Sequence, residues 1–417
     1  MHPRQSCRIV ITGIGLCTPL GSDRESSWSA LVDGKSGVEW VKAPHWTDLS
    51  LMPGAQVCLP ENRPFHHNEP LVELGLTTAS EALEDANLNP QELNAQSIGV
   101  VFGTSKGGLH SFSQQFQAFR TSGMLASRST ATGRSISNDL SWLDVLPNRP
   151  AAAIGQWLGG DGPILCPVAA CATGLAACLR GAELIHSGAC NVVLAGSADV
   201  SLQPALLSSF RRLGVLSRET EFAAHACRPF DRNRSGFVVG EGAACLVLES
   251  LESARQRGKT YYAEWIGGSM LSDPFGLTQL DPSGETLQKL LQILAAKNSG
   301  LPDYINLHGT GTMTNDQVES RAIRRVFGRD VDRFHCSSLK GGLGHLLGAA
   351  GSVELAATAL AIRDQIVPPT VNLLQIDPDC ELQMTPVTSV SRPINNAWKI
   401  SMGFGGHVAG ACLRKPE

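Results

Sequence analysis

The ten residues VAACATGLAA, at positions 168–177, place one cysteine between an apolar run and the Ala- and Gly-rich start of a helix. We expect Cys171 to sit on a tight turn at the N-terminus of that helix, where the macrodipole and free N–H groups stabilise a thiolate. That position suits a nucleophile. The alternative is a small buried thiol among small side chains, and the segment alone leaves both interpretations open.

On both sides of this stretch, apolar runs and small-residue segments alternate along most of the chain. Short runs rich in Val and Ile alternate with Ala-rich segments of helical length, which predicts β-α-β units and a largely parallel sheet. The expected strands are 8–12, 97–102, 191–195 and 243–248, and the expected helices are 70–86, 173–187 and 249–258. After Gly258 the succession repeats, with strands over 261–266 and 304–307 and helices over 283–298 and 348–362. The repeat is a weak indication of duplication.

The stretch 108–150 breaks this alternation. It is rich in Ser, Gln, Arg and Thr rather than in regularly spaced apolar residues. A long segment of this kind inside a compact domain is typical of a functional insertion. We expect it to cover part of the molecule or to meet a partner.

A histidine ends the expected strand at 304–307. The segment NLHGTGT, residues 306–312, runs from that strand into a loop of glycine and threonine. His308 can face a ligand there, and Thr310 and Thr312 offer hydrogen bonds to an amide or phosphate chain. The alternative for His308 is a core or capping histidine.

A second histidine follows a lysine on a glycine-rich turn. The segment SSLKGGLGH, residues 337–345, leads into the helix that contains Glu354. Lys340, His345 and Glu354 are suited to form one electrostatic unit. The alternatives are a solvated lysine and a helix-capping histidine.

A fourth segment, MGFGG at 402–406, has glycines on both sides of Phe404. Glycines leave room for a close backbone approach and for unusual dihedral angles, although an ordinary turn also uses them. Together the four segments supply a nucleophile, two imidazoles, a cation and a closely approaching backbone. This combination indicates acyl transfer through a thioester.

Composition excludes several other classes of protein. The 417 residues are 42% hydrophobic and 17% charged with a net charge of −4, which gives enough apolar mass for a large core and disfavours nucleic-acid binding. No C-x-x-C or zinc-finger spacing occurs among the 12 cysteines, so we expect no metal site. No apolar run has the length of a membrane span, and the N-terminus does not resemble a signal peptide. We expect a cytoplasmic protein with free thiols and no membrane span.

Over nearly its full length the chain resembles the β-ketoacyl-acyl carrier protein synthases of the elongating type and their type II polyketide relatives. The motifs A-C-A-T-G, H-G-T-G-T and K-x-x-x-x-H-L-L-G-A-A-G occur in the family's order, between V-I-T-G-I-G at 10–15 and G-F-G-G at 403–406, with P-F-D-R-N-R-S-G-F-V-V-G-E-G at 229–242 among them. The resemblance implies an α/β fold of the thiolase type, with duplicated halves in α-β-α-β-α layers. It also implies an N-terminal half over 1–258, which carries the cysteine, and a C-terminal half over 259–417, which carries the histidines and the lysine.

The resemblance further implies a decarboxylative Claisen condensation. Cys171 would take an acyl group from an acyl carrier protein, and a malonyl unit on a second carrier would lose carbon dioxide and attack the thioester. His308 and His345 would donate hydrogen bonds to the enolate as neutral imidazoles. Lys340, paired with Glu354, would hold His345 neutral and in position.

The resemblance gives the remaining site residues their roles. The backbone N–H groups of Cys171 and Phe404 would form an oxyanion hole, and the Phe404 ring would gate the acyl pocket. Thr310 and Thr312 would bind the pantetheine arm. The substrates travel on the phosphopantetheine of the carrier protein, so no separate cofactor is expected.

Three departures from the family pattern bear on the substrate. His407 and Val408 replace the usual threonine and asparagine, and Asn315-Asp316-x-x-Glu319 looks more like aromatic or polyene ketosynthases. Lys106 stands where fatty-acid enzymes have an apolar residue, and a cation in an alkyl pocket is costly unless it is paired or turned to solvent. We expect Lys106 to bind substrate by shortening or polarising the pocket, so that Lys106→Ile extends the accepted chain.

Two other functions compete with catalysis. A non-catalytic partner subunit that sets chain length in a heterodimer shares the fold but lacks the cysteine, whereas a degradative thiolase uses a second cysteine late in the chain as its base. The only late cysteine here, Cys412, lies beyond the 403–406 turn. The family forms homodimers and heterodimers, and both stay open. An acidic carrier protein would dock on basic residues near the pocket entrance. The candidates are Arg120, Arg128, Arg134, Arg211 and Arg212.

Overall fold

The computed structural model describes residues 7–41, 52–60, 62, 64–90, 98–122, 142–219, 221–298 and 300–417. Its main feature is a ten-stranded sheet in the order β11-β10-β14-β15-β9-β1-β8-β6-β4-β5. The strands of its N-terminal half are β1 (Ile9–Cys17), β4 (Ile98–Gly103), β5 (Ile164–Leu165), β6 (Val192–Asp199) and β8 (Gly242–Ser250). The strands of its C-terminal half are β9 (Ala263–Ser272), β10 (Tyr304–Asn306), β11 (His335–Ser337), β14 (Asn396–Gly403) and β15 (His407–Arg414).

Each half of the sheet has the same strand order. Numbered by their occurrence in the chain, the five strands of either half lie in the order 3-2-4-5-1 from the outer edge inward. The first strands, β1 and β9, meet at the centre and pair antiparallel over three residues, Ile9–Ile11 against Ala263–Trp265. The expected α/β fold with duplicated halves is confirmed. The expectation of a largely parallel sheet is wrong, because four pairings in this sheet are parallel and five are antiparallel.

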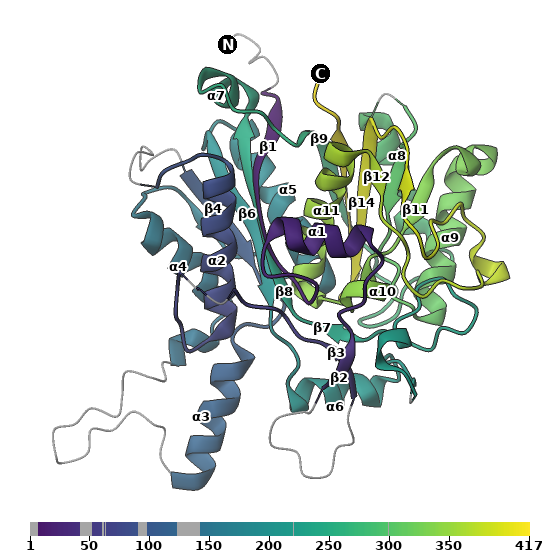
Figure 1. Ribbon diagram of the computed structural model, residues 1–417, viewed down its shortest axis with the longest axis horizontal. Coiled ribbons are helices and arrows are strands. Elements are labelled where there is room, and N and C mark those ends of the chain that lie inside the picture. The colour runs from purple at the N-terminus through teal and green to yellow at the C-terminus, as the bar shows by residue number, and fades with distance from the viewer. Residues whose placement is uncertain are drawn as a thin grey trace.

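Helices cover the sheet in layers. Two lie on the outer face of the N-terminal half, α2 (Pro70–Asp85) and α4 (Arg149–Leu158), and two lie on the outer face of the C-terminal half, α8 (Glu285–Lys297) and α9 (Met313–Phe327). Between the halves, α5 (Thr173–His186) packs against α11 (Ala350–Asp364), and both contact strands of each half (Figure 1). Three hydrophobic cores separate these layers, which gives the expected α-β-α-β-α arrangement.

The remaining elements connect these layers or lie at their margins. Among the described residues, the shorter helices are α1 (Arg24–Val32), α6 (Pro204–Leu213), α7 (Leu251–Gln256) and α10 (Lys340–Leu343). The short strands are β2 (Glu39–Val41), β3 (Met52–Ala55), β7 (Val239–Gly240), β12 (Ile366–Val367) and β13 (Val390–Ser391). The helix expected over 249–258 is wrong at its start, because Glu249 and Ser250 belong to β8 and the Ser250 side chain caps α7 by accepting from the Ser253 N–H.

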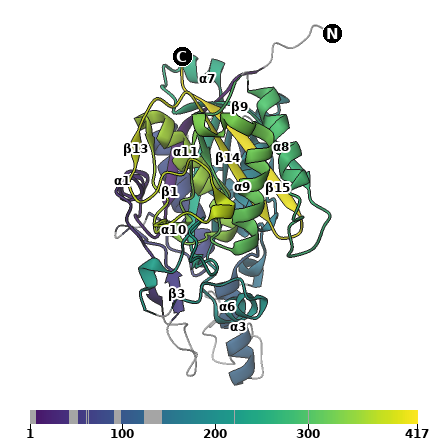
Figure 2. The same ribbon diagram turned by 90° about the vertical axis from the view of Figure 1, so that its right-hand side faces the viewer.

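The stretch 108–150 does form a distinct region in its described parts. It begins with α3 (Leu109–Ser122), which extends away from the layered body (Figures 1 and 2). Phe112, Phe116 and Phe119 on this helix are exposed. The candidate docking residues Arg128 and Arg134 lie outside the described residues.

Candidate active site

Cys171 lies on a single 3-10 turn, Ala170–Ala172, that leads directly into α5. Ala170 is left-handed, with φ of 46°. Thr173 holds the turn closed, since its hydroxyl donates to the Ala170 carbonyl and accepts from the Ala169 N–H, both at 2.8 Å. The expected tight turn at a helix N-terminus is therefore present, and a backbone conformation that alanine rarely adopts is strained in the way common at reactive residues.

The end of β14 comes up against this turn. A Cβ built on Gly403 would lie 2.8 Å from the Ala169 carbonyl oxygen and 3.1 Å from the Cys171 amide nitrogen, so a side chain there would force the turn to shift. The next residue, Phe404, directs its backbone N–H at the Cys171 thiol. The Phe404 N–H thus lies beside Cys171, which is one of the two donors that the expected oxyanion hole requires.

The charge state expected for Cys171 needs correction. Burial raises the pKa of the Cys171 thiol to about 11, and the favourable fields of Lys106 and Lys340 only partly oppose it. At this pKa the resting group is the neutral thiol rather than the expected thiolate, because removal of the sulfur from water outweighs both cations and the Phe404 N–H. The resting group is a neutral thiol that loses its proton during the attack.

His345 is held as a neutral imidazole with a defined tautomer. The Leu347 N–H donates to His345 Nδ1 at 3.3 Å, so the ring proton sits on Nε2. Burial lowers the pKa of His345 well below its usual value, and the fields of Lys340, Lys106 and Lys399 lower it further. The edge of the His345 ring packs against Phe237 with ring centroids 5.2 Å apart. His345 therefore offers a hydrogen-bond donor that does not change charge near neutral pH.

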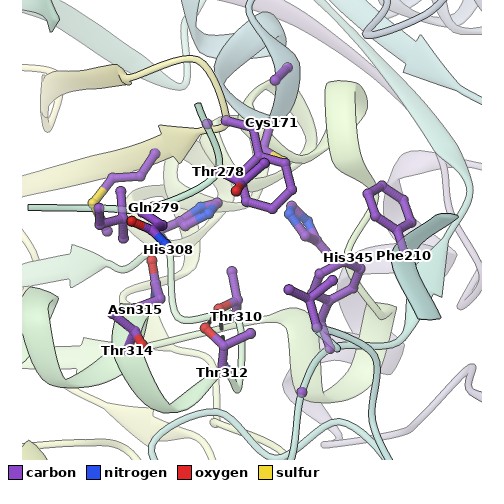
Figure 3. A pocket seen from close by; sticks show the side chains of 18 of the residues that line it. Cys171, Phe210, Thr278, Gln279, His308, Thr310, Thr312, Thr314, Asn315 and His345 are labelled. Carbon is purple, nitrogen blue, oxygen red and sulfur yellow. Dashed lines mark hydrogen bonds between the residues drawn. The ribbon is translucent and has the colours of Figure 1, made fainter. Parts of the chain in front are cut away.

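His308 follows β10 and is fixed through its backbone. Its N–H donates to Glu319 Oε1 at 2.6 Å, and the Gly309 N–H donates to Glu319 Oε2 at 2.8 Å. Burial, followed by the fields of Lys340, His345 and Lys399, lowers the pKa of His308 well below its usual value. Its ring lies edge-on to that of His345 with centroids 5.4 Å apart (Figure 3). Two neutral imidazoles thus share one space with Cys171.

A buried charge cluster lies behind the histidines. Lys340 Nζ is 2.6 Å from Glu354 Oε1 and donates to the His308 carbonyl at 2.5 Å, so the expected pair of Lys340 and Glu354 is present. The other carboxylate oxygen, Oε2, lies 2.5 Å from Nζ of a second lysine, Lys399. All three side chains are fully or almost fully buried.

Sequence analysis missed both Lys399 and the role of Glu319. The signal for Lys399 was a lone lysine in the apolar strand segment AWKISMG at 397–403, where a charge is out of place. The signal for Glu319 was weaker, because a glutamate eleven residues after His308 on a polar helix resembles surface. Only the packing of α9 against the loop after β10 brings its carboxylate to the two N–H groups.

Cys171, His308 and His345 line one cavity of about 990 Å³. Leu206, Phe210, Phe237 and Phe404 supply apolar parts of its wall, and Thr310 and Thr312 line another part, with their hydroxyls 2.9 Å apart (Figure 3). A cavity of this size can hold a drug-sized ligand, and its mixed lining suits an acyl chain with a polar arm.

Lys106 lines the same cavity and is paired. Its ammonium donates to the Ser105 hydroxyl, and its Nζ is 3.6 Å from Asp199 Oδ2. The buried Asp199 carboxylate also accepts from the Gly348 N–H at 3.1 Å, so its position is fixed by the turn before α11. The ion pair explains how a cation is tolerated beside an apolar cavity.

The arginines proposed for docking are only partly placed near the cavity. Arg211 and Arg212 are exposed at the end of α6, whose Leu206 and Phe210 line the cavity, and Arg120 is exposed on α3. Sequence analysis missed Arg218, which is exposed and lines the cavity itself.

No helix in the described part of the chain is long and apolar enough to cross a membrane. Within those same ranges, no cluster of His, Cys, Asp and Glu has the arrangement of a metal site.

Comparison with known proteins gives consistent matches. The model of the β-ketoacyl synthase N-terminal domain matches residues 6–254, and that of the C-terminal domain matches residues 262–374. The 3-oxoacyl-[acyl-carrier-protein] synthase 2 of Synechocystis sp. is 33% identical over 98% of both chains. The ketoacyl synthase alpha subunit of the tetracenomycin polyketide synthase of Streptomyces glaucescens is 32% identical over 98% of this chain and 97% of that one.

Solved structures agree with these matches. One is a type II polyketide synthase acyl carrier protein in complex with its ketosynthase bound to the hexaketide. It superimposes with a TM-score of 0.89 at 30% identity and covers 99% of this chain and 100% of that chain.

Proposed function

The chain belongs to the β-ketoacyl synthase family, and on this premise we propose that it condenses an acyl thioester with malonyl-acyl carrier protein through an acyl-enzyme on Cys171. The observation that supports this most directly is the single cavity shared by Cys171, two neutral imidazoles and the N–H of Phe404. The same arrangement serves fatty-acid and type II polyketide or polyene elongation.

In the first half-reaction the Cys171 sulfur attacks the carbonyl carbon of an acyl carrier thioester. The new S–C bond replaces the bond to the carrier, and the thiol proton of Cys171 passes to the departing carrier thiolate. The N–H groups of Cys171 and Phe404 stabilise the tetrahedral oxyanion. Because the resting thiol is neutral, proton loss and attack occur together, which suits a buried group with a raised pKa.

In the second half-reaction the malonyl carboxylate leaves as carbon dioxide, and the electron pair of the broken C–C bond forms the enolate of the thioester. The N–H groups of His308 and His345 stabilise the enolate oxygen. The enolate carbon then attacks the acyl carbonyl on Cys171, and the C–S bond breaks. Cys171 regains one proton, and the product is a β-ketoacyl carrier two carbons longer.

The polar parts of the cavity support the roles of three further residues. Thr310 and Thr312 bind the amide-bearing pantetheine arm through their hydroxyls. Lys106 binds a substrate and sets the pocket's polarity, because its ammonium faces the cavity from beside Asp199. Lys106→Ile should then extend the accepted acyl chain, and an unchanged chain-length preference would contradict this role.

The carrier protein is the proposed partner. Arg211 and Arg212 at the end of α6 and Arg218 at the cavity give an acidic carrier a basic landing site beside the Cys171 cavity. The enzyme works as a homodimer or with a related ketosynthase-like subunit, as the alpha-subunit name of the Streptomyces relative suggests. It needs no cofactor beyond the carrier's phosphopantetheine.

Residues 1–258 and 259–417 form its two halves. Its 12 free cysteines are in keeping with the cytoplasm.

Intact-mass analysis tests the acyl-enzyme. Wild type, Cys171→Ala and Cys178→Ala are each incubated with a panel of acyl carrier thioesters and then with malonyl carrier protein. Cys178 is the matched control because it is a buried thiol on the same helix. Wild type and Cys178→Ala should gain the acyl mass and lose it as a β-ketoacyl carrier appears, while Cys171→Ala gains none. A wild type that never acylates would favour the alternative of a non-catalytic chain-length subunit.

A further inference from the structure

Lys399 is a fully buried lysine in the middle of β14. Its ammonium lies 2.5 Å from Glu354 Oε2 and donates to two backbone carbonyls, those of Leu307 at 3.2 Å and Ile400 at 2.6 Å. The ammonium therefore has one ion-pair partner and two hydrogen-bond acceptors. A buried charge with such partners is a built feature of the fold, since an isolated one would be strongly destabilising.

These contacts reach the residues that fix His308. Lys399 holds the Leu307 carbonyl and Lys340 holds the His308 carbonyl, and Glu354 bridges the two ammonium groups. From the other side, Glu319 holds the N–H of His308. Charged side chains thus hold the peptide groups before and after His308 by hydrogen bonds. Lys399 holds the carbonyl of the preceding residue.

The cluster places two positive charges behind the histidines. Lys340 and Lys399 share the carboxylate of Glu354, and the nearby Glu319 also acts on Lys399, so loss of the Lys399 charge leaves the carboxylates in excess. In the chain's interior a charge is weakly screened and acts over several ångströms. The field of Lys399 reaches both imidazole rings, because it contributes to holding His308 and His345 neutral.

We propose that Lys399 is a positioning residue of the condensation half-reaction: it holds the backbone before His308 and, with Lys340, places positive charge behind the two histidines. This inference rests on the proposed function, since the charge matters where a negative enolate develops. Cys171 acylation passes through an oxyanion beside the N–H groups of Cys171 and Phe404, so it depends less on Lys399.

The pH dependence of condensation separates the proposed role from a purely structural one, because a structural role does not require the charge of Lys399. Burial lowers the pKa of Lys399 to about 8, against the opposing field of Glu354. The titratable groups that interact with it are Glu354 on α11, Lys340 on α10, Glu319 on α9 and the two histidines, His308 and His345. Burial raises the pKa of Glu319 to about 7, so the measurement is made above pH 7, where Glu319 is mostly ionised. Above pH 8 the positive charge of Lys399 is lost.

The experiment compares acylation and condensation in the full-length protein. Wild type, Lys399→Met, Lys399→Arg and the control Lys289→Met are assayed from pH 7 to 9.5 with acyl and malonyl carrier proteins. Lys289 is a suitable control because it is an exposed lysine paired with Glu285 on α8, so its loss changes net charge far from the site. Acylation is followed by intact mass, and condensation is followed in single turnovers of the acylated enzyme.

The expected results separate the two half-reactions. In wild type, the single-turnover rate of condensation falls as pH rises through about 8. At pH 7.2, Lys399→Met loses about tenfold in condensation kcat, with acylation and the KM for malonyl carrier within about twofold. Its condensation no longer falls near pH 8. Lys399→Arg retains its charge and keeps condensation high to pH 9.5. Lys289→Met behaves as wild type.

Three results would overturn the inference. One is an equal loss of acylation and condensation in Lys399→Met, which would indicate a structural role alone. Another is unchanged condensation in a folded Lys399→Met. The third, decisive even if neither Lys399 variant folds, is a wild-type single-turnover rate of condensation that stays flat from pH 7 to 9.5. A wild type that never acylates would instead contradict the proposed function.

Discussion

The helices α5 and α11 occupy equivalent places in the two halves and begin in the same way. Each follows a 3-10 turn that opens on a left-handed non-glycine residue, Ala170 with φ of 46° before α5 and Leu347 with φ of 49° before α11. The two helix starts touch, since a Cβ on Gly174 would lie 2.4 Å from the Ser352 nitrogen. The duplicated backbone therefore brings two similar turns face to face at the centre of the molecule.

The side chains on these turns differ completely. Counted from the left-handed residue, Cys171 in the first half matches Gly348 in the second, and Ala177 matches Glu354. The first turn carries the nucleophile among small neutral groups, whereas the second helix carries the carboxylate that joins Lys340 to Lys399. The two halves thus share a backbone arrangement, but their side chains serve different parts of the site.

Removing the charge from Glu354 should have the largest effect on stability. Glu354→Gln deprives two buried ammonium groups of the carboxylate that pairs with both, which should lower the free energy of unfolding by about 3–5 kcal/mol. Urea unfolding followed by circular dichroism measures this. The exposed Glu285→Gln, which breaks only the surface pair with Lys289, should cost less than about 0.5 kcal/mol. Equal losses in the two variants would mean that the buried cluster has no special dependence on its carboxylate.

Adding a methyl group where the helices touch should have the next largest effect. A Cβ on Gly351 would lie 2.4 Å from the Leu175 nitrogen, so Gly351→Ala forces α5 and α11 apart and should cost about 1–3 kcal/mol. Gly300→Ala is the control, because a Cβ there meets no atom within 4 Å. Thermal and urea unfolding of both variants would show whether the helix contact is as tight as the structure describes. A Gly351→Ala protein as stable as Gly300→Ala would contradict it.

The charge state of Cys171 gives the smallest but most specific effect. With a pKa of about 11, its thiolate fraction rises tenfold per pH unit across the neutral range, and so should its rate of alkylation by iodoacetamide. Lys106→Met removes a favourable field and should slow alkylation severalfold at any pH below 10. Peptide mass spectrometry gives the rate at Cys171 itself. An alkylation rate that stays constant between pH 7 and 8 would mean that Cys171 is already a thiolate there, as the helix N-terminus led us to expect.

Much of this molecule follows from local sequence. Alternating apolar runs and Ala-rich segments predicted most of the strands and helices, because hydrophobic periodicity reflects which face of an element is buried. The glycines around Phe404 predicted a close backbone approach, and the structure shows Gly403 against the Cys171 turn. The start of α7 was missed because the Ser250 cap competes with a helical pattern that begins two residues earlier.

The sequence by itself determined the order of Cys171, His308, Lys340 and His345 and the turns that carry them. Only the tertiary structure decided their charge states, the pairing of Lys106 with Asp199 and the place of Lys399 beneath the histidines. The physical reason is that burial and electrostatic fields sum over groups far apart in the chain. Glu354 and Lys399 are separated by 45 positions in sequence and by 2.5 Å in the fold.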